Sequence, residues 1–263
     1  ELKERLVEEA NNVHWIPKWA HDRLYHILEN LQDWVLSRQR YWGTPLPIWV
    51  CPDGHLIVVG SKDELEKLSG KEPRSLHRPW IDEITLRCPI CGKEMKRIPD
   101  VADVWFDSGI AFYAVRNHPE RPNSDEVDID LITEGHDQIR GWFFSLLRAG
   151  VIMFNKAPYR TVLVHGFVND EKGREMHKHL GNYVGVDEVM QKIGRDALRL
   201  WLLQSTTWED VKFSWKALER IKKDLLIVWN VYKFASTYME IDKFDPMVYK
   251  LEDYLNELRY EDR

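Results

Sequence analysis

Two short apolar segments, each followed by a longer stretch of helical pattern, constrain the fold of this chain most strongly. Residues 131–133 and 161–164 are rich in Leu, Ile, Thr and Val, a composition typical of short buried strands. Stretches with the apolar spacing of helices follow at about 138–153 and 186–203. Because strand, helix, strand and helix in this order are typical of a parallel sheet covered by helices, we predict an α/β fold for residues 101–204.

The regions on either side of this α/β part are predicted to be largely helical. Residues 1 to about 40 have a mostly helical pattern with Pro17 as a break, and residues 1–49 are expected to lead into the rest of the chain. A buried stripe is expected from the apolar residues at helical spacing, which are Leu24, Ile27, Leu28, Leu31, Trp34 and Val35. Beyond residue 205 a second such stripe is expected, formed by Ala217, Ile221, Leu225, Val228, Trp229 and Tyr232.

The composition is that of a soluble globular protein. Of the 263 residues, 44% are hydrophobic and 30% are charged. The net charge of −6 argues against a broad nucleic-acid-binding surface, so any RNA contact is expected to be local. No apolar run is long enough to cross a bilayer and no signal-peptide pattern is present, and we expect a cytoplasmic protein with no membrane partner. The chain starts inside a charged helical stretch without a methionine, which suggests a fragment of a longer protein.

Three cysteines and one histidine have the spacing of a metal site. Cys88 and Cys91 form a C-x-x-C-G turn, in which two thiolates can bind one tetrahedral Zn²⁺. Upstream, Cys51 and His55 lie on either side of another tight turn. Together they form a Cys₃His set, which leaves no open coordination position and therefore indicates a structural zinc in a small insertion over residues 50–100. The alternative is that Cys51 is a small buried apolar residue and His55 a surface histidine.

Polar residues follow the first predicted strand where a ligand of a parallel sheet would bind. Glu134, Gly135, Asp137 and Gln138 come directly after that strand and before the next helix. The carboxylates of Glu134 and Asp137 could accept hydrogen bonds from ribose hydroxyls or from a substrate ammonium. The alternative is that Asp137 caps the helix and that Glu134 is a solvated turn residue.

Two further segments could contribute to the same site. His165-Gly166 follows the second predicted strand, and a glycine there would let the backbone approach a flat ring such as adenine. The loop of residues 170–182 contains Lys178, whose ammonium could stabilise negative charge on a pyrophosphate leaving group, although such loops are usually just solvated. Residues 103–109 are predicted to be the edge of a strand that runs into a turn.

In this order the segments resemble the isoleucyl-tRNA synthetases, a family of class I aminoacyl-tRNA synthetases, over essentially the whole chain. The most specific stretches are residues 37–45, 104–109 and 134–143. The resemblance implies the C-terminal half of a Rossmann-like parallel sheet, with a zinc-binding insertion and, over residues 205–263, the start of the helical anticodon-binding region. It further implies a ligase that activates L-isoleucine with ATP and Mg²⁺ and transfers it to tRNA(Ile).

The resemblance also implies a role for each site residue. Glu134 and Gln138 would form part of the aminoacyl-adenylate site, with Gly135 and Asp137 toward the ribose. Trp105 would line the amino-acid pocket together with Glu134 and Gln138, and a rigid indole suits an aliphatic side chain. The residues expected to flank adenine are His165, Gly166 and Val168. Lys178 would be the second lysine of the KMSKS signature and the catalytic charge stabiliser.

Two departures from the family pattern are expected to reduce activity. The signature loop, residues 175–179, reads Glu-Met-His-Lys-His and lacks the first lysine and both serines, although protonated histidines could partly substitute. No HIGH-type signature, first strand of the nucleotide fold or editing domain is found in the sequence, so an N-terminal half is expected to be missing. We therefore predict an enzyme fragment that is inactive or very weak alone. The alternative is a catalytically inert, zinc-containing module that binds tRNA or another partner.

Overall fold

The computed structural model describes residues 1–117 and 129–248. The chain forms two compact units, residues 1–165 and residue 166 onward, and each is described by itself. The boundary between the units falls inside residues 101–204, which the sequence pattern groups as one domain. The division into domains that was predicted from the sequence stays a prediction.

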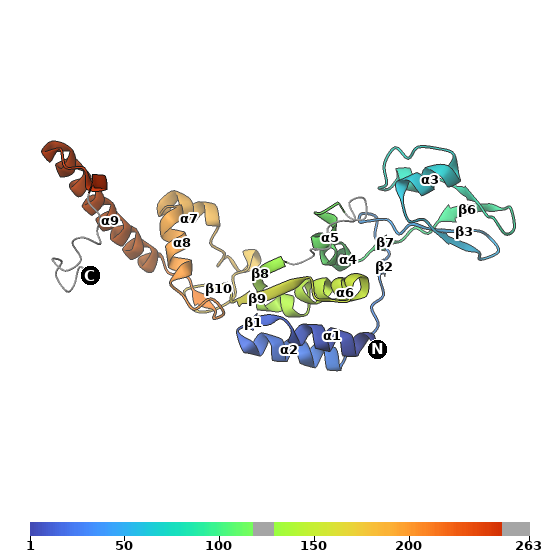
Figure 1. Cartoon of the computed structure of the whole chain (residues 1–263), viewed down its shortest axis with the longest axis horizontal. Coiled ribbons are helices and arrows are strands. Elements are labelled where there is room, and N and C mark those ends of the chain that lie inside the picture. Colours follow the sequence, from blue (N-terminus) through green and yellow to red (C-terminus); the bar gives the residue numbers. More distant parts are fainter. Residues whose placement is uncertain (118–128, 249–263) are drawn as a thin grey trace. The chain divides into compact units, whose positions relative to one another are not determined.

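The first unit contains a three-stranded parallel sheet (Figure 1). Its order is β1 (His14–Ile16), β9 (Tyr159–His165) and β8 (Ile129–Gly135). All pairings are parallel, and Gly135 is in register with His165, so β8 and β9 end at the same edge. The predicted α/β fold with a parallel sheet is thereby confirmed. The sequence pattern did not predict β1, which is only three residues long and lies within a region of helical pattern.

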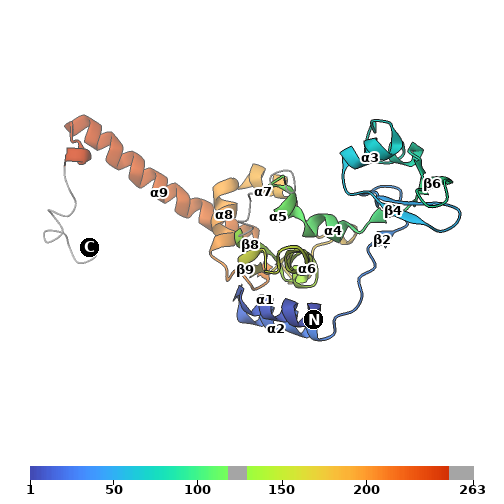
Figure 2. The same ribbon diagram turned by 45° about the vertical axis from the view of Figure 1, so that its right-hand side comes forward.

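Helices α1 (Leu2–Asn11), α2 (Lys18–Glu29) and α6 (Trp142–Phe154) form the core of this unit with the sheet. Helix α1 packs against both α2 and α6, and Figure 2 shows α1 and α2 side by side. Leu24 and Leu28 are fully buried, as expected. The last part of the predicted stripe is wrong, because α2 ends at Glu29. Val35 lies on the extended segment after the helix, and its side chain is 66% exposed.

Residues 48–97 fold as a small antiparallel sheet of their own, in the order β4 (Leu56–Val58), β3 (Ile48–Val50), β6 (Glu94–Arg97) and β5 (Leu86–Arg87). Helix α3 (Lys62–Ser69) begins where the Ser61 hydroxyl accepts a hydrogen bond from the backbone N–H of Glu64. Trp49, Leu65 and Met95 lie in a hydrophobic core separate from that of the parallel sheet. The predicted insertion is therefore a module with its own sheet and its own core.

The segment after the module differs from the prediction. Strand β7 (Val101–Ala102) pairs with β2 (Ser37–Arg38), but residues 104–109 form helix α4 (Val104–Gly109), followed by α5 (Ala111–Ala114). The prediction of a strand edge running into a turn is therefore wrong for this segment. The buried Asp103 is the cause, because its side chain accepts a hydrogen bond from the N–H of Trp105 and caps the helix.

The second unit is built from a short parallel pair and three helices. Strand β10 (Val168–Asn169) pairs with β11 (Val211–Lys212), and the helices are α7 (Val186–Lys192), α8 (Arg195–Leu203) and α9 (Trp215–Asp242). Short 3₁₀ turns occur in both units, at Trp80–Glu83, His136–Ile139, Lys178–Leu180 and Pro246–Val248. The predicted helical stretches at 138–153 and 186–203 correspond to α6 and to the pair α7 and α8.

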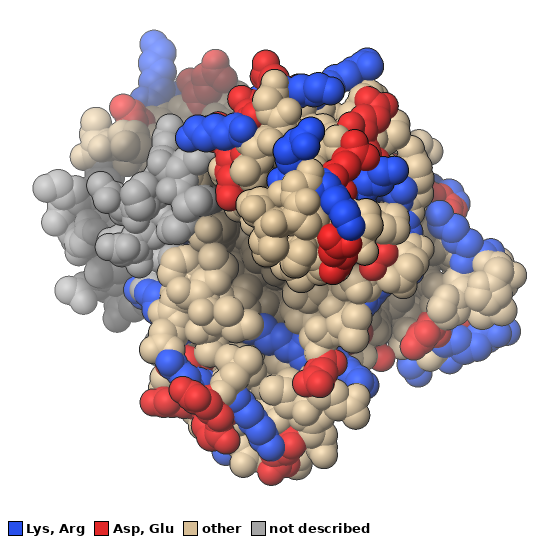
Figure 3. Space-filling model, turned by 90° about the vertical axis from the view of Figure 1, so that its right-hand side faces the viewer, with Lys and Arg blue, Asp and Glu red and all other residues tan. Residues whose placement is uncertain are grey.

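The stripe predicted along α9 is only partly buried. Leu218 and Ile221 lie in the core of the second unit, whereas Val228, Trp229 and Tyr232 are 66%, 60% and 67% exposed. Their burial was wrongly predicted because helical spacing shows which residues share a face and does not show whether that face has a partner. Within the described residues, no helix combines the length and apolar character needed to span a membrane. On the face shown in Figure 3, Lys and Arg side chains are interspersed with Asp and Glu side chains.

Candidate functional site

The predicted site residues of the first unit come together at the carboxyl end of the parallel sheet. Glu134 is in register with Val164, and Gly135 with His165. The 3₁₀ turn His136–Ile139 starts directly after β8, so Asp137 and Gln138 lie at the same edge. Glu134 and Asp137 are exposed and Gln138 is partly buried. This clustering is the arrangement expected of a ligand site, and the role of each residue stays a prediction.

Gln138 connects this edge with Trp105. Its Oε1 accepts a hydrogen bond from the backbone N–H of Trp142 at 3.1 Å, and its Nε2 donates to Asp137 Oδ2 at 2.6 Å. A Cβ atom on Gly141 would lie 2.7 Å from Gln138 Oε1 and 3.0 Å from the Trp105 ring. Trp105 and Gln138 therefore both border the space that this glycine leaves open. Among the described residues, Gln138, not Asp137, satisfies the first N–H of α6, which removes the interpretation of Asp137 as its cap.

Trp142 was not among the site residues predicted from the sequence. Its indole Nε1 donates to the carbonyl oxygen of Ser108 at 3.0 Å, which connects α6 to α4. This bond places a second indole next to the segment that contains Trp105. Its position in the sequence could have indicated this role, because Trp142 directly follows Gly141 within residues 134–143, one of the stretches that carry the family resemblance.

At position 166 a glycine is required, because the backbone of Glu209 in the second unit leaves no room for a Cβ atom. A Cβ atom there would lie 2.3 Å from the carbonyl carbon of Glu209, and the N–H of Gly166 donates to Thr207 at 2.9 Å. The close approach of the Glu209 backbone therefore accounts for this glycine by itself. An additional contact with a flat ring stays a prediction.

The loop that contains Lys178 is held at its base by Asp170. The Asp170 carboxylate accepts hydrogen bonds from the backbone N–H groups of Lys172 and Arg174, from Arg174 Nε and from Asn182 Nδ2, at 2.8 to 3.0 Å. Asn182 also donates to the carbonyl of Glu175 and accepts from the N–H of His177. Asp170 and Asn182, which were not predicted as site residues, thus hold the two ends of the loop together.

The bond from Asn182, followed by the backbone N–H of Arg174, holds the pKa of Asp170 well below its usual range. Because the pKa is lower in the folded state, the stabilisation from this carboxylate is complete above about pH 4 and is lost as the pH falls further. We expect Asp170→Asn to speed amide exchange at Lys172 and Arg174 by about tenfold at pH 7, since the amide offers one acceptor oxygen instead of two.

The matched control is Glu171→Gln, which removes an exposed carboxylate next to it. Hydrogen exchange followed by NMR at pH 7 and at pH 3 is the measurement. The explanation is contradicted if the Asp170 variant exchanges at the wild-type rate, or if both variants speed exchange equally.

Lys178 lies on the 3₁₀ turn Lys178–Leu180, and its ammonium is 5.6 Å from the ring centroid of Tyr183. The rings of His177 and His179 stack at 5.2 Å, and His177 Nε2 is 3.3 Å from a carboxylate oxygen of Glu175. Glu175, predicted to occupy the place of the first signature lysine, therefore lies within ion-pair distance of His177.

Val168 and the signature loop share a pocket of about 440 Å³ in the second unit. Val168, Met176 and His177 are among the lining residues, and α7 and α8 contribute the apolar side chains of Val186, Val189, Leu198, Trp201 and Leu202. Asn169 also lines it. Its Nδ2 donates to Asp210 at 3.4 Å, while its Oδ1 is buried and has no hydrogen-bond partner among the described residues.

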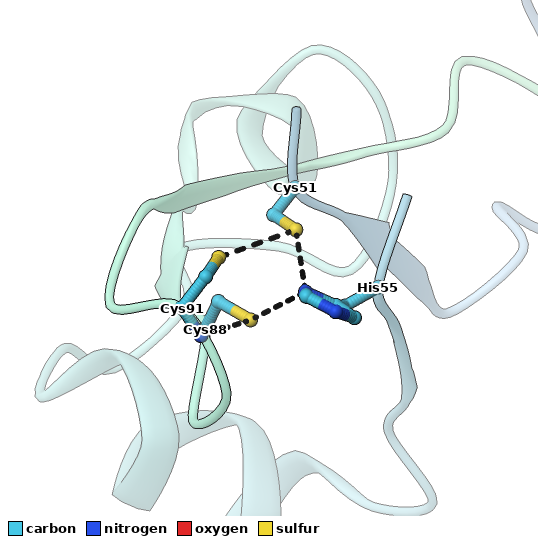
Figure 4. Close-up of side chains that lie close together, drawn as sticks. All are labelled: Cys51, His55, Cys88 and Cys91. Atoms are coloured by element: carbon cyan, nitrogen blue, oxygen red, sulfur yellow. Dashed lines mark hydrogen bonds between the residues drawn. The ribbon is translucent and has the colours of Figure 1, made fainter. Parts of the chain in front are cut away.

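The four predicted metal ligands point toward one another (Figure 4), with ligand atoms all within 4.8 Å. His55 Nδ1 lies 3.4 Å from Cys51 Sγ and 3.6 Å from Cys88 Sγ, and the sulfurs of Cys91 and Cys51 are 3.6 Å apart. The backbone N–H of Cys91 lowers the pKa of the Cys88 thiol to about 6, which favours the thiolate. Cys51 is buried, yet its sulfur faces His55, so this group can hold a metal ion.

The comparisons with known proteins agree with this fold. The family described as "tRNA synthetases class I (I, L, M and V)" matches residues 1–214. In fold, the chain is similar to an Agrobacterium radiobacter K84 LeuRS solved with tRNA and LeuAMS (TM-score 0.62, 24% identity, 81% of this chain and 30% of that one). It is also similar to the methionyl-tRNA synthetase of Mycobacterium tuberculosis (TM-score 0.52, 18% identity, 82% and 34%). The chain belongs to the class I tRNA synthetases.

Within that class, its curated relatives are isoleucine--tRNA ligases. It is 55% identical to the enzyme of Saccharolobus solfataricus over 99% of this chain, and 47% identical to that of Methanopyrus kandleri over the whole of it. It covers 27% and 26% of these relatives, so it spans about a quarter of their length. The resemblance to the isoleucyl-tRNA synthetases is thereby confirmed.

Proposed function

We propose that this chain supplies part of the site in which isoleucine is activated by ATP and transferred to tRNA(Ile). The observation that carries the proposal is the edge at which β8 and β9 end, where Glu134 closes the strand and Gln138 borders the same space as Trp105. The relatives that share this segment are isoleucine--tRNA ligases. A carboxylate for the substrate ammonium and an indole for the aliphatic side chain are the groups that a small apolar amino acid requires.

The chemistry follows from positioning. The carboxylate oxygen of isoleucine attacks the α-phosphorus of ATP in line, and the bond from that phosphorus to the bridging oxygen breaks. Pyrophosphate leaves with the electron pair, and no covalent enzyme intermediate forms. Glu134 and Gln138 hold the amino acid, Gly135 and Asp137 approach the ribose, and Lys178 stabilises the charge that develops on pyrophosphate. Mg²⁺ accompanies ATP as part of the substrate.

For adenine we propose His165, Gly166 and Val168, and Val168 lines the pocket of the second unit. The apolar side chains of that pocket suit a flat ring.

We propose Zn²⁺ for the metal site. Three thiolates and one imidazole are the ligands that this ion prefers, and four protein ligands leave no position for a substrate. Such an ion would connect the turn after β3 with the turn between β5 and β6. Its role would be to stabilise the module, outside the reaction itself.

The activation site is tested with a non-hydrolysable isoleucyl-adenylate analogue. We expect the chain to bind it, and Glu134→Gln to weaken binding by about tenfold to a hundredfold, because a charge-assisted hydrogen bond to the substrate ammonium is lost. Glu134 is exposed, so the substitution should leave the fold intact. Titration calorimetry is the measurement, with Glu8→Gln on the exposed face of α1 as the matched control.

The second candidate function is a catalytically inert module that binds tRNA or a partner. The pairing of Glu175 with His177 favours it, because a carboxylate stands where the signature supplies a cation. An inert module has no reason to retain a pocket for an adenylate. If the chain is folded and does not bind the analogue, the activation proposal fails and this candidate takes its place.

A further inference from the structure

Three arginines line one pocket of about 510 Å³ in the first unit. Arg23 lies on α2, Arg140 directly follows the 3₁₀ turn His136–Ile139, and Arg148 lies on α6. Among the described residues, no carboxylate lies within ion-pair distance of these arginines, and Asp33 is the single acidic residue in the wall. We call this space the arginine pocket.

Arg148 is held in place by two aromatic rings. Its guanidinium carbon lies 3.8 Å from the ring centroid of Phe144 and 5.0 Å from that of Trp34. Phe144 belongs to the hydrophobic core, and the Trp34 indole donates a hydrogen bond to the buried Asp103 at 3.0 Å. Because both rings are fixed, the guanidinium loses little conformational freedom when a ligand binds to it.

The hydrogen-bond donors of Arg148 have no acceptor among the described residues. An aromatic ring attracts the positive charge of a guanidinium but supplies no lone pair for its N–H donors. Arg148 is half-buried, and burial lowers its pKa below the usual value, although a guanidinium stays protonated. A half-buried cation without a counter-ion is costly, and an anion in the arginine pocket would remove that cost.

The other charges around the arginine pocket also favour an anion. Arg23 and Arg140 are exposed, so their side chains can turn toward a ligand, and Asp33 is exposed and well solvated. The carboxyl end of α2 carries partial negative charge, but the carbonyl of Glu29 at that end accepts a hydrogen bond from Lys3 Nζ at 2.8 Å. Three arginines therefore face a single opposing carboxylate in the wall.

We propose that the arginine pocket binds a small anion that carries phosphate groups, with phosphate oxygens bound by Arg148 and by the two exposed arginines. A guanidinium forms paired hydrogen bonds with a phosphate, and a phosphate has enough oxygens and charge to engage more than one arginine. A single carboxylate has only two oxygens and suits one arginine. The inference does not depend on the proposed function, because none of the residues proposed to bind the adenylate lines this pocket.

The test is a titration of the isotope-labelled 263-residue chain with pyrophosphate, followed by NMR at the Nε–H of Arg148 and at the indole N–H of Trp34. We expect both signals to shift and to saturate with a Kd of about 1 mM or below. Arg148→Lys should weaken binding by about tenfold, because an ammonium keeps the charge and loses the paired donors; here the Trp34 signal is followed. Arg23→Gln should weaken it by about threefold or more.

The matched control for Arg23→Gln is Arg199→Gln, which removes an exposed arginine from α8 in the second unit and should leave the affinity unchanged. Lys178→Gln should also leave the Arg148 shift unchanged, which separates this pocket from pyrophosphate bound at the signature loop. Absence of an Arg148 shift would overturn the inference, as would wild-type affinity in both Arg148→Lys and Arg23→Gln. An equal shift with acetate at the same ionic strength would also overturn it, since a single carboxylate would then suffice.

Discussion

Isoleucine-dependent exchange of pyrophosphate into ATP should be at least about four orders of magnitude slower with this chain alone than with a complete synthetase. The HIGH-type signature, which would contact the phosphates from the other side, is absent from the 263-residue sequence. Each lost contact to a developing charge typically costs about 3–4 kcal/mol, and two or three such contacts account for this loss in rate. Glu175, in place of the first signature lysine, lowers the rate further.

The measurement is the exchange of labelled pyrophosphate with the purified chain, ATP and isoleucine. Binding of the isoleucyl-adenylate analogue serves as the control that the chain is folded and that its part of the site is formed. A variant with Glu175→Lys should remain inactive, because one cation on the loop does not replace the missing contacts. Exchange at a rate near that of complete synthetases would show that residues 1–263 suffice, and the assignment of an incomplete site would be wrong.

Removal of the metal should unfold the antiparallel module and leave the parallel sheet folded. We expect about one zinc per chain, since the four ligand atoms form a single cluster. Structural zinc sites contribute about 10–16 kcal/mol of binding free energy, far more than a module of this size can replace by packing. In Cys88→Ser, the amides of Trp49 and Met95 should lose hydrogen-exchange protection, whereas those of Ile132 and Val162 should keep it.

The matched control is Lys93→Ala, which breaks the 2.6 Å pair between Lys93 and Asp53 beside the site without removing a ligand. This pair is exposed to solvent, so its loss should cost little stability and leave the zinc content unchanged. Absence of zinc from protein purified without chelators would contradict the proposal. Retention of zinc and of full protection in Cys88→Ser would also contradict it.

Features encoded over a few neighbouring residues were predictable from the amino-acid sequence. The apolar runs at 131–133 and 161–164 indicated β8 and β9, and the residues after β8 followed from the rule that ligands bind where parallel strands end. The metal ligands were predictable because each pair lies on one tight turn, so only the approach of the two turns had to be inferred. In both cases the residues of the site lie close together in the sequence, so their positions in space are already restricted by the local backbone.

Features that depend on contacts between distant segments could not be read from local patterns. Strand β1 has three residues and is a strand because it pairs with β9, which is more than 140 positions away in the chain. The exposed part of α9 has the apolar spacing of a buried helix, and only the absence of a packing partner among the described residues shows otherwise. Gly166 is explained by the backbone of Glu209.

The same distinction applies to the candidate site. The positions of Glu134 and Gln138 could be predicted because these residues lie at the end of a strand. The hydrogen bond from the N–H of Trp142 to Gln138, and the short distance between Gln138 and Trp105, could not be predicted and are known only from the structure. Likewise, the contact of the Arg148 guanidinium with the Trp34 ring brings together residues 114 positions apart. Periodicity and turn chemistry act over a few residues, so they specify elements and their ends. Which side chains meet is settled by packing, since that free energy comes from surfaces supplied by segments far apart in the chain.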